Sequence, residues 1–292
     1  MERKSIMESN NPTLSRVLNE DLQTEKRQEL ITEIEDSISD IRSEECRVMC
    51  YIAKRSMNAD DVKAFEDMLQ SVDSPEVLYL FINSPGGDPE TALRVIEMCR
   101  ERSSHFRAVV PDMAKSAATQ VCLGTEEIAM GYNSELGPID PQIPFRGEWT
   151  AAYTIKEGLE LIETRAKEKP EVPTQVYQAI AQHYDPALLR RAEKAINYIE
   201  DMATEIAGNM FNDDDEATDC VEELLELNPH GKSINIEQAE NMGLNIFDLR
   251  DHEDLWSKIW ELYIRSDTIM DEHGREKLWE TKDHTISTGG DG

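Results

Sequence analysis

The stretch Val77–Asp88, which reads VLYLFINSPGGD, sets the interpretation of the chain around it. Its first six residues are apolar and include the aromatic and branched side chains that suit a buried strand. The apolar run then gives way to Asn-Ser-Pro-Gly-Gly, in which Gly86 and Gly87 can adopt backbone angles that other residues avoid. This stretch therefore predicts a buried strand that ends in a glycine turn.

A second stretch, Phe106–Gly124, follows the same plan with the sequence FRAVVPDMAKSAATQVCLG. Its apolar run precedes a group of very small residues around Ser116, and a helix is predicted from Ser116 to Leu123, before the closing glycine. A serine at a helix start lies where developing negative charge is stabilised, and its alanine neighbours leave room for a carbonyl group. The pattern indicates a nucleophilic serine.

Together the two stretches indicate a catalytic site. Free amides of the turn, from Gly86 or Gly87, and the amide of Ala117 would donate hydrogen bonds to an oxyanion formed at Ser116. Each motif alone has a simpler interpretation, since Ser-Pro-Gly-Gly is a common turn and a serine between alanines is usually a helix cap. Their occurrence one strand–helix repeat apart favours the catalytic interpretation.

The elements predicted around these stretches alternate between strands and helices. Strands are predicted at Cys46–Ala53, Val77–Ile82, Phe106–Val110 and Glu127–Gly131, and helices at about 58–72, at Pro89–Arg102 and after Ser116. Such alternation favours one α/β domain, built on a parallel sheet with crossover helices. Farther along, helices are predicted at Thr150–Lys169, Gln175–Tyr184 and about 185–209, with Asn212–Glu216 as a solvated acidic break.

We divide the chain into three parts. Residues 1–45 are interpreted as a disordered N-terminus followed by a charged amphipathic helix, residues 46–250 as the main domain, and residues 251–292 as a C-terminal helix with a polar tail. The apolar stripe of the first helix, within Glu20–Glu45, fits a helix lying on the domain better than an oligomer contact. The tail beyond Asp267 is expected to fray.

Composition disfavours several classes of protein. The 292 residues carry a net charge of −30, which argues against nucleic acid or an anionic membrane as the main partner. The charged first residues and the lack of a long apolar run predict neither a signal peptide nor a membrane span. Five cysteines without paired C-x-x-C spacing indicate free thiols in a reducing compartment, and hence the cytosol. No metal or other cofactor is expected, because the acidic break lacks the spacing and glycine of an EF-hand calcium loop.

Three motifs resemble those of known serine peptidases. INSPGG at Ile82–Gly87 resembles the oxyanion-loop motif of the proteolytic subunit of Clp protease, and KSAAT at Lys115–Thr119 resembles the nucleophile motif of that superfamily. SELGPIDPQI at Ser134–Ile143 resembles the pattern of the serine dehydrogenase proteinase family, a cytosolic relative of signal peptide peptidase A. The likeness runs from about Val48 to Leu249.

The resemblance implies a Clp/crotonase-like fold of repeated ββα units, with a parallel sheet and flanking helices. It also implies a serine endopeptidase that acts on polypeptide and forms homo-oligomers. The Clp proteolytic subunit uses a histidine base shortly after the motif Asn-Ser-Glu, but Leu136–Asp140 contains none. Signal peptide peptidase relatives use a lysine instead, which needs burial to lower its pKa towards neutrality.

Two lysines are candidates for this base. Lys194 lies in a segment that resembles a lysine-bearing helix of the family, and it is the preferred partner of Ser116 in a Ser-Lys dyad. Lys156, in the first helix past the nucleophile region, is the second candidate, and another base or none stays open. Lys115 is expected to point away from Ser116, and His230 is interpreted as a turn residue.

The sequence thus predicts a cytosolic Ser-Lys peptidase, with two alternatives. One is a catalytically inactive oligomeric scaffold of the same fold. The other is a crotonase-type acyl-CoA enzyme, because that fold also uses paired oxyanion amides. The acidity of the chain and the serine in the nucleophile position disfavour the acyl-CoA enzyme.

Overall fold

A seven-stranded sheet forms the centre of the computed structural model, which describes residues 24–72, 75–169, 171–182, 185–211, 213–227 and 232–289. Its strands are β1 (Cys46–Ala53), β2 (Val77–Asn83), β3 (His105–Val110), β5 (Ile128–Met130), β9 (Ile246–Asp248), β10 (Lys277–Glu280) and β11 (Thr285–Thr288). They lie in the order β11-β10-β1-β2-β3-β5-β9. The strands from β1 to β9 are parallel, and β10 and β11 extend the sheet in antiparallel pairing. This mostly parallel α/β architecture confirms the predicted fold class.

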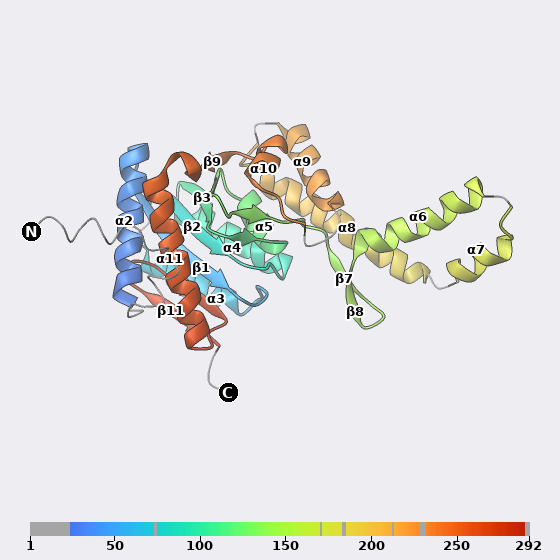
Figure 1. Cartoon of the computed structure of the whole chain (residues 1–292), viewed down its shortest axis with the longest axis horizontal. Coiled ribbons are helices and arrows are strands. Elements are labelled where there is room, and N and C mark those ends of the chain that lie inside the picture. Colours follow the sequence, from blue (N-terminus) through green and yellow to red (C-terminus); the bar gives the residue numbers. More distant parts are fainter. Residues whose placement is uncertain are drawn as a thin grey trace, which may run out of the picture.

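Helices cover both faces of this sheet (Figure 1). One face carries α2 (Thr24–Arg42) and α11 (Glu253–Glu272), side by side, and the other carries α3 (Asp61–Ser71), α4 (Pro89–Arg102) and α5 (Ala117–Leu123). None of the helices in the described ranges combines the length and the apolar character needed to span a bilayer.

Strand β2 shows how the two faces are filled. Leu78, Leu80 and Ile82 join the core beneath α3, α4 and α5, whereas Tyr79 and Phe81 join the core beneath α2 and α11. All five side chains are buried. Burial on both faces explains why this strand is a continuous apolar run rather than an alternation of apolar and polar residues.

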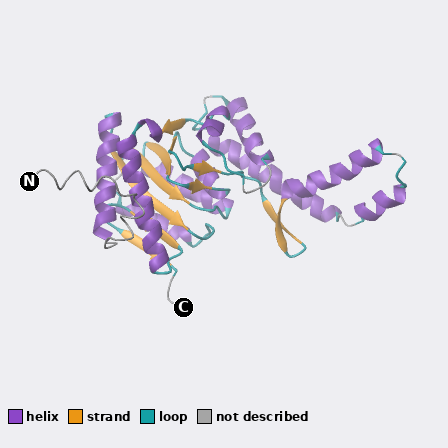
Figure 2. Cartoon of the chain, viewed as in Figure 1, coloured by secondary structure: helices purple, strands orange, loops and turns teal. Residues whose placement is uncertain are grey.

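A second group of elements extends away from the sheet (Figures 1 and 2). An arm is formed by α6 (Ala152–Glu168), α7 (Thr174–Ala181) and the first part of α8 (Pro186–Ala207), with the hairpin of β7 (Gln142–Phe145) and β8 (Glu148–Ala151) at its base. The later part of α8 and α9 (Asp214–Glu226) contribute side chains to the same core as α5. The remaining elements are β4 (Met113–Ala114), β6 (Glu135–Leu136), α10 (Ile236–Asn241) and the short helix η2 (Leu249–Asp251).

Two predictions in this region need correction. The hairpin β7–β8 occupies the chain before α6. Helix α6 therefore begins at Ala152 rather than at Thr150. The acidic segment predicted as a break is, from Asp213 onwards, the cap and first turn of α9, and the Asp213 carboxylate accepts a hydrogen bond of 2.8 Å from the Asp215 amide. Acidic side chains stabilise a helix N-terminus, so their exposure is compatible with a helix. Asn212 lies outside the described residues.

The prediction of a frayed tail beyond Asp267 is wrong. Helix α11 continues to Glu272, and β10 then pairs with β1 inside the sheet. Leu278 and Trp279 of β10 are almost fully buried. Two apolar residues between charged neighbours are too short a pattern to indicate a strand, and long-range pairing decides their conformation.

The charged amphipathic helix predicted near the N-terminus is present as α2, and its apolar stripe lies on the domain. The buried residues Leu30, Ile31, Ile34 and Ile38 pack into the core that α2 shares with α11. Residues 1–23, which include the segment predicted as disordered, lie outside the described residues.

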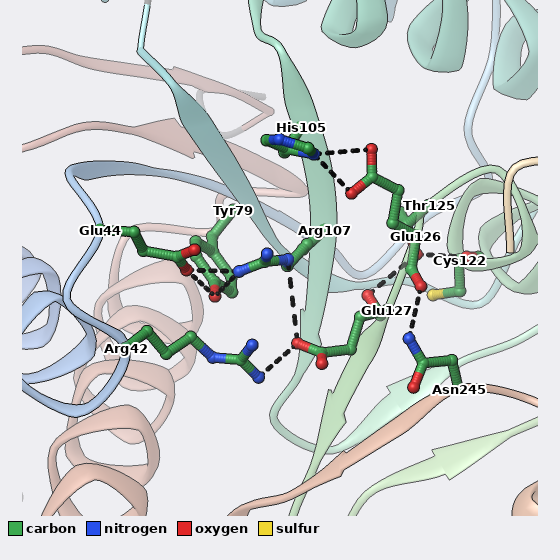
Figure 3. A network of polar contacts seen from close by, with 10 residues as sticks. All are labelled: Arg42, Glu44, Tyr79, His105, Arg107, Cys122, Thr125, Glu126, Glu127 and Asn245. Carbon is green, nitrogen blue, oxygen red and sulfur yellow. Dashed lines mark hydrogen bonds and ion pairs between the residues drawn. The ribbon is translucent and has the colours of Figure 1, made fainter.

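A polar network fastens the end of α2 to the sheet (Figure 3). Arg42 donates to Glu127 at 2.6 Å, while Arg107 of β3 donates to Glu44 and, at 2.7 Å, to the hydroxyl of Tyr79 on β2. Burial raises the pKa of Tyr79, so its hydroxyl stays neutral between these charges. The network lies towards the amino ends of the strands, so it supports the fold at the end away from the candidate site.

Glu35 of α2 provides a test of how the helix is attached. This buried carboxylate accepts a hydrogen bond of 2.9 Å from the Val48 amide, and its burial raises its pKa. A raised pKa in the folded state means that the group favours folding below its ordinary pKa, and that this contribution is lost as the pH rises through the folded-state pKa.

We therefore expect Glu35→Gln, which keeps the acceptor and removes the charge, to raise the melting temperature near neutral pH. The gain should shrink as the pH falls to about 4, where the wild-type carboxyl is protonated. Thermal unfolding followed by circular dichroism measures the effect, with the exposed neighbour Asp36→Asn as the control. An equal gain at both pH values would contradict the role of burial.

Candidate active site

The loops that follow β2 and β3 lie against each other at the carboxyl ends of these strands. The Ser84 amide donates to the Met113 carbonyl at 3.0 Å, and the Lys115 amide donates to the Ser84 carbonyl at 3.1 Å. The side-chain oxygen of Asn83 accepts from the Met113 amide at 2.8 Å. These bonds hold the Gly-Gly turn beside the nucleophile segment, although the whole of α4 separates the two in sequence.

Gly86 and Gly87 lie where any side chain would collide with main chain. Gly86 has φ +95°, and an added Cβ would lie 2.4 Å from the Lys115 carbonyl oxygen and 2.7 Å from Ser116 Cβ. Gly87 has φ +147°, and an added Cβ would lie 2.2 Å from the carbonyl oxygen of Met57, in the loop after β1. The turn therefore requires glycine both for its backbone angles and for the close approach of three loops.

Ser116 holds a backbone conformation that few residues other than glycine adopt, with φ +51° and ψ −119°. It immediately precedes α5, as predicted, but its side chain makes no capping hydrogen bond to that helix. The residue is partly exposed and lines a cavity. Strained residues cluster at functional sites, and the ordinary structural role of a serine at this position, the helix cap, is unfilled.

The amides around Ser116 divide into engaged and available donors. The Gly86 amide donates to the Ser84 hydroxyl at 3.1 Å, so it is used within its own loop. Within the described ranges, the amides of Gly87 and Ala117 make no recorded hydrogen bond. The two available donors thus come from the turn after β2 and from the residue that follows Ser116.

A cavity of about 670 Å³ opens beside Ser116. It is lined by the turn, by the segment after β6, by the hairpin and by α8, and the contributions include Gly87, Asp88, Ile139, Pro141, Trp149, Ala195, Tyr198 and Ile199. A cavity of this size accommodates several groups of a peptide chain. Its charged lining residues in the described part of the chain are Asp88 and Asp140, which are both acidic.

The structure brings Ser116, the two glycines and Ala117 together, but not the candidate lysines. Lys194 is exposed on α8, next to the cavity-lining residue Ala195. Lys156 is exposed on α6, with its ammonium nitrogen 5.8 Å from the ring centre of Tyr153. Neither lysine lines the cavity in the described structure. Both assignments therefore stay predictions.

Lys115 is held away from the serine that follows it, as its position in the sequence predicts. Its ammonium nitrogen lies 2.7 Å from Glu135 and donates to the Leu136 carbonyl at 2.9 Å. These partners fix the ammonium group against β6. The ion pair lowers the pKa of Glu135, although partial burial alone would raise it.

Two polar residues of the cavity wall were missed in the sequence. Gln120, one turn after Ser116 on α5, is 2% exposed, and its side-chain oxygen has no hydrogen-bond partner in the described part of the chain. Asp140 is 4% exposed and accepts from the Gln142 side chain at 2.7 Å. Asp140 is the titratable residue of the segment Leu136–Asp140, which contains no histidine. For Gln120, the sequence signal is a long polar side chain within a helix that otherwise consists mostly of small and apolar residues.

Cysteine offers no competing nucleophile here. All five cysteines are free and buried. Burial raises the pKa of Cys46 to about 11, and it also raises the pKa of Cys122, which lies on the helix that follows Ser116. A thiol with a raised pKa is not ionised near neutral pH. His230, interpreted as a turn residue, lies outside the described residues.

Comparison with known proteins identifies a family match and two relatives. The family model for the ClpP-like SDH-type serine proteinase matches residues 16–266. Uncharacterized protein MJ0137 of Methanocaldococcus jannaschii is 26% identical over 185 residues, which are 63% of this chain and 57% of that protein. Uncharacterized protein MJ1495 of the same organism is 26% identical over 116 residues, which are 36% of this chain and 39% of that protein. The chain thus spans about half the length of these relatives or less.

Several solved structures share a likeness with this chain. A mutant of the 1510-N membrane-bound stomatin-specific protease is 15% identical with a TM-score of 0.44, and the likeness covers 70% of this chain and 79% of that chain. A second mutant of that protease, in complex with a substrate peptide, is 14% identical with a TM-score of 0.44, covering 84% and 89%. ClpP1 from Listeria monocytogenes is 13% identical with a TM-score of 0.42, covering 76% and 98%.

The collision predicted at Gly86 can be separated from its backbone strain. Gly86→Ala adds a Cβ that collides with the segment 115–117, whereas Gly147→Ala, at φ +90°, meets nothing within 4 Å. We expect Gly147→Ala to lose about 1 kcal/mol from strain alone, and Gly86→Ala to lose at least about 2 kcal/mol more. Urea denaturation gives both values. Equal losses at the two positions would show that the loops do not touch as described.

Proposed function

This chain belongs to the family of ClpP-like SDH-type serine proteinases, and from that premise we propose that it hydrolyses peptide bonds with Ser116 as the nucleophile. The observation that carries the proposal is the setting of this serine. Its backbone is strained, its hydroxyl does not cap α5, and it faces a cavity that adjoins the glycine turn. A serine with a purely structural role at a helix start would not combine these three features.

We assign the oxyanion hole to the amides of Gly87 and Ala117. The sequence also suggested Gly86, but its amide donates to Ser84, so its role is to bring the turn against Ser116. The Ser116 oxygen would attack the peptide carbonyl carbon, and the negative carbonyl oxygen of the tetrahedral intermediate would accept from the two amides. Such donors contribute roughly 3–4 kcal/mol to transition-state stabilisation.

The reaction then needs a group that moves protons. A base accepts the proton of Ser116 as the carbon–oxygen bond forms, and the proton is delivered to the amine as the carbon–nitrogen bond breaks. Water hydrolyses the resulting ester and restores the serine. The substrate is extended polypeptide, whose apolar groups would contact the hydrophobic lining of the cavity.

We keep Lys194 as the proposed base and Lys156 as the second candidate. Lys194 precedes Ala195 and lies one turn before Tyr198, and both of these residues line the cavity. A lysine acts as a base at neutral pH only when burial lowers its pKa, and Lys194 is exposed in the single chain. The proposal therefore includes a homo-oligomer or a bound substrate that covers this part of α8.

The exposure of both lysines supports one alternative, the inactive scaffold of the same fold. The acyl-CoA enzyme finds no such support, because the charged lining residues described in the cavity are acidic and would repel the phosphates of CoA.

We also propose that the protein works in the cytosol. Five buried, unpaired cysteines fit a reducing compartment.

Labelling with a fluorophosphonate probe tests the nucleophile. We expect covalent labelling of the wild type at Ser116 and none of Ser116→Ala, because the probe reacts with a serine that has a base and an oxyanion hole. Ser56→Ala is the matched control, since Ser56 is an exposed hydroxyl that lines the same cavity. A folded wild-type protein that remains unlabelled would favour the scaffold.

Substitution of the lysines tests the base. We expect Lys194→Ala to slow the labelling of Ser116 about 100-fold, and Lys156→Ala to leave the rate nearly unchanged. The reverse result for the two variants transfers the assignment to Lys156, and full activity of both removes it from either residue.

A further inference from the structure

The glycine turn rests on Met57, in the loop after β1. The Met57 amide donates to the Gly86 carbonyl at 2.7 Å, and the Asp88 amide donates to the Met57 carbonyl at 2.9 Å. Met57 and Gly87 form an isolated parallel bridge. The position of the Gly87 amide is therefore set by the position of Met57.

The loop that carries Met57 is in turn held by Asp61, the first residue of α3. Its carboxylate accepts from the Asn58 amide at 3.0 Å, and the Asp61 amide donates to the Asn58 carbonyl at 2.9 Å. The Tyr51 hydroxyl donates to the same carboxylate at 3.0 Å. Burial raises the pKa of Tyr51, and Asp61 adds to the effect, so this hydroxyl keeps the proton that it donates.

The carboxylate of Asp61 is neutralised by Lys277 of β10. The ammonium nitrogen lies 2.7 and 2.8 Å from the two carboxylate oxygens. Lys277 is 5% exposed and Asp61 is 3% exposed, so the pair is shielded from water. Lys277 pairs with Ala53, the last residue of β1, which places the ion pair at the same end of the sheet as Ser116.

We infer that the buried Lys277–Asp61 ion pair positions the glycine turn for catalysis, through Asn58 and Met57. The inference rests on the proposed function, since it assigns Gly87 a place in the oxyanion hole. Lys277 and Asp61 are positioning residues, since neither lines the cavity beside Ser116. Lys277 lies beyond residues 16–266, the part that matches the family, so a C-terminal strand of this chain supports the site from outside the matched region.

Removal of Lys277 should act on the chemical step rather than on binding. A buried carboxylate without its partner shifts or recruits water, and the Asn58 and Met57 segment moves with it. When the oxyanion amides are misplaced, their hydrogen bonds to the negative oxygen weaken, and these bonds are strongest in the transition state. The rate of the chemical step therefore falls, while the affinity for the substrate is retained.

Strand β10 also supplies a matched control. Arg27 of α2 and Glu280 of β10 form a second buried ion pair at 2.8 Å, with 3% and 0% exposure. This pair joins the same strand to α2, on the opposite face of the sheet, and it makes no hydrogen bond to the Met57 loop in the described structure. Loss of this pair should affect stability without moving the glycine turn.

The experiment measures how fast a fluorophosphonate probe inactivates the protein, as the limiting rate kinact and the half-saturating concentration KI. We expect Lys277→Met to lower kinact by about 10- to 100-fold with KI within about twofold. The double variant Asp61→Asn with Lys277→Met keeps an acceptor for the Asn58 amide and leaves no buried charge, so it should recover most of kinact. The control Arg27→Met with Glu280→Gln should keep kinact within about twofold.

A milder variant, Tyr51→Phe, tests the same inference if Lys277→Met does not fold. It removes one hydrogen-bond donor to Asp61 and keeps the aromatic ring. It should lower kinact about fivefold, again with KI unchanged. Folding of each variant is verified by circular dichroism. A normal kinact in folded Lys277→Met and Tyr51→Phe, or an equal loss in the control, overturns the inference.

Hydrogen exchange separates this inference from the proposed function. If the wild type does not react with the probe, the proposed peptidase fails, but the support of the loop can still be measured. Faster exchange of the segments 55–60 and 84–88 in Lys277→Met than in the control then upholds the positioning of the turn. Equal exchange in these two variants rejects it.

Discussion

The contact between Gly86 and the segment 115–117 is the constraint on which the site depends. Two parallel strands, β2 and β3, deliver their following loops to the same edge of the sheet, and at Gly86 the loops approach so closely that a side chain would collide. Several polar groups maintain the contact. Asn83 binds the Met113 amide, and Thr119 donates to the Ala114 carbonyl at 2.7 Å. Most residues of the two motifs thus serve to present one hydroxyl, that of Ser116.

The parts of the site that could be predicted from the sequence are those that depend on neighbouring residues. The strand ends, the glycine turn and the start of α5 depend on short-range features, namely an apolar run followed by glycine or by small residues. Such features can be recognised in a single sequence. The meeting of the two loops could also be anticipated, because parallel neighbouring strands place their carboxyl ends together.

Long-range pairing accounts for what the sequence did not reveal. Lys277 appears in a polar tail, and its partner Asp61 is 216 positions away. Nothing near Lys277 in the sequence distinguishes it from a solvated lysine. The converse holds for Lys194, which lies on an amphipathic helix near the site but on its exposed face. For a lysine the decisive property is burial, and burial is a property of the fold rather than of the neighbouring residues.

The charges of β10 also bear on how this strand finds its register. Lys277 and Trp279 face α3, whereas Leu278 and Glu280 face α2, so a shift of one residue would exchange the two faces. Lys277 would then lie on the face that carries Arg27, and Glu280 on the face that carries Asp61, so neither buried ion pair could form. Buried ion pairs add little net stability, but such a mismatch is costly. We therefore infer that the two ion pairs specify one pairing of β10 with β1, and that this pairing brings Lys277 to the carboxylate behind the glycine turn.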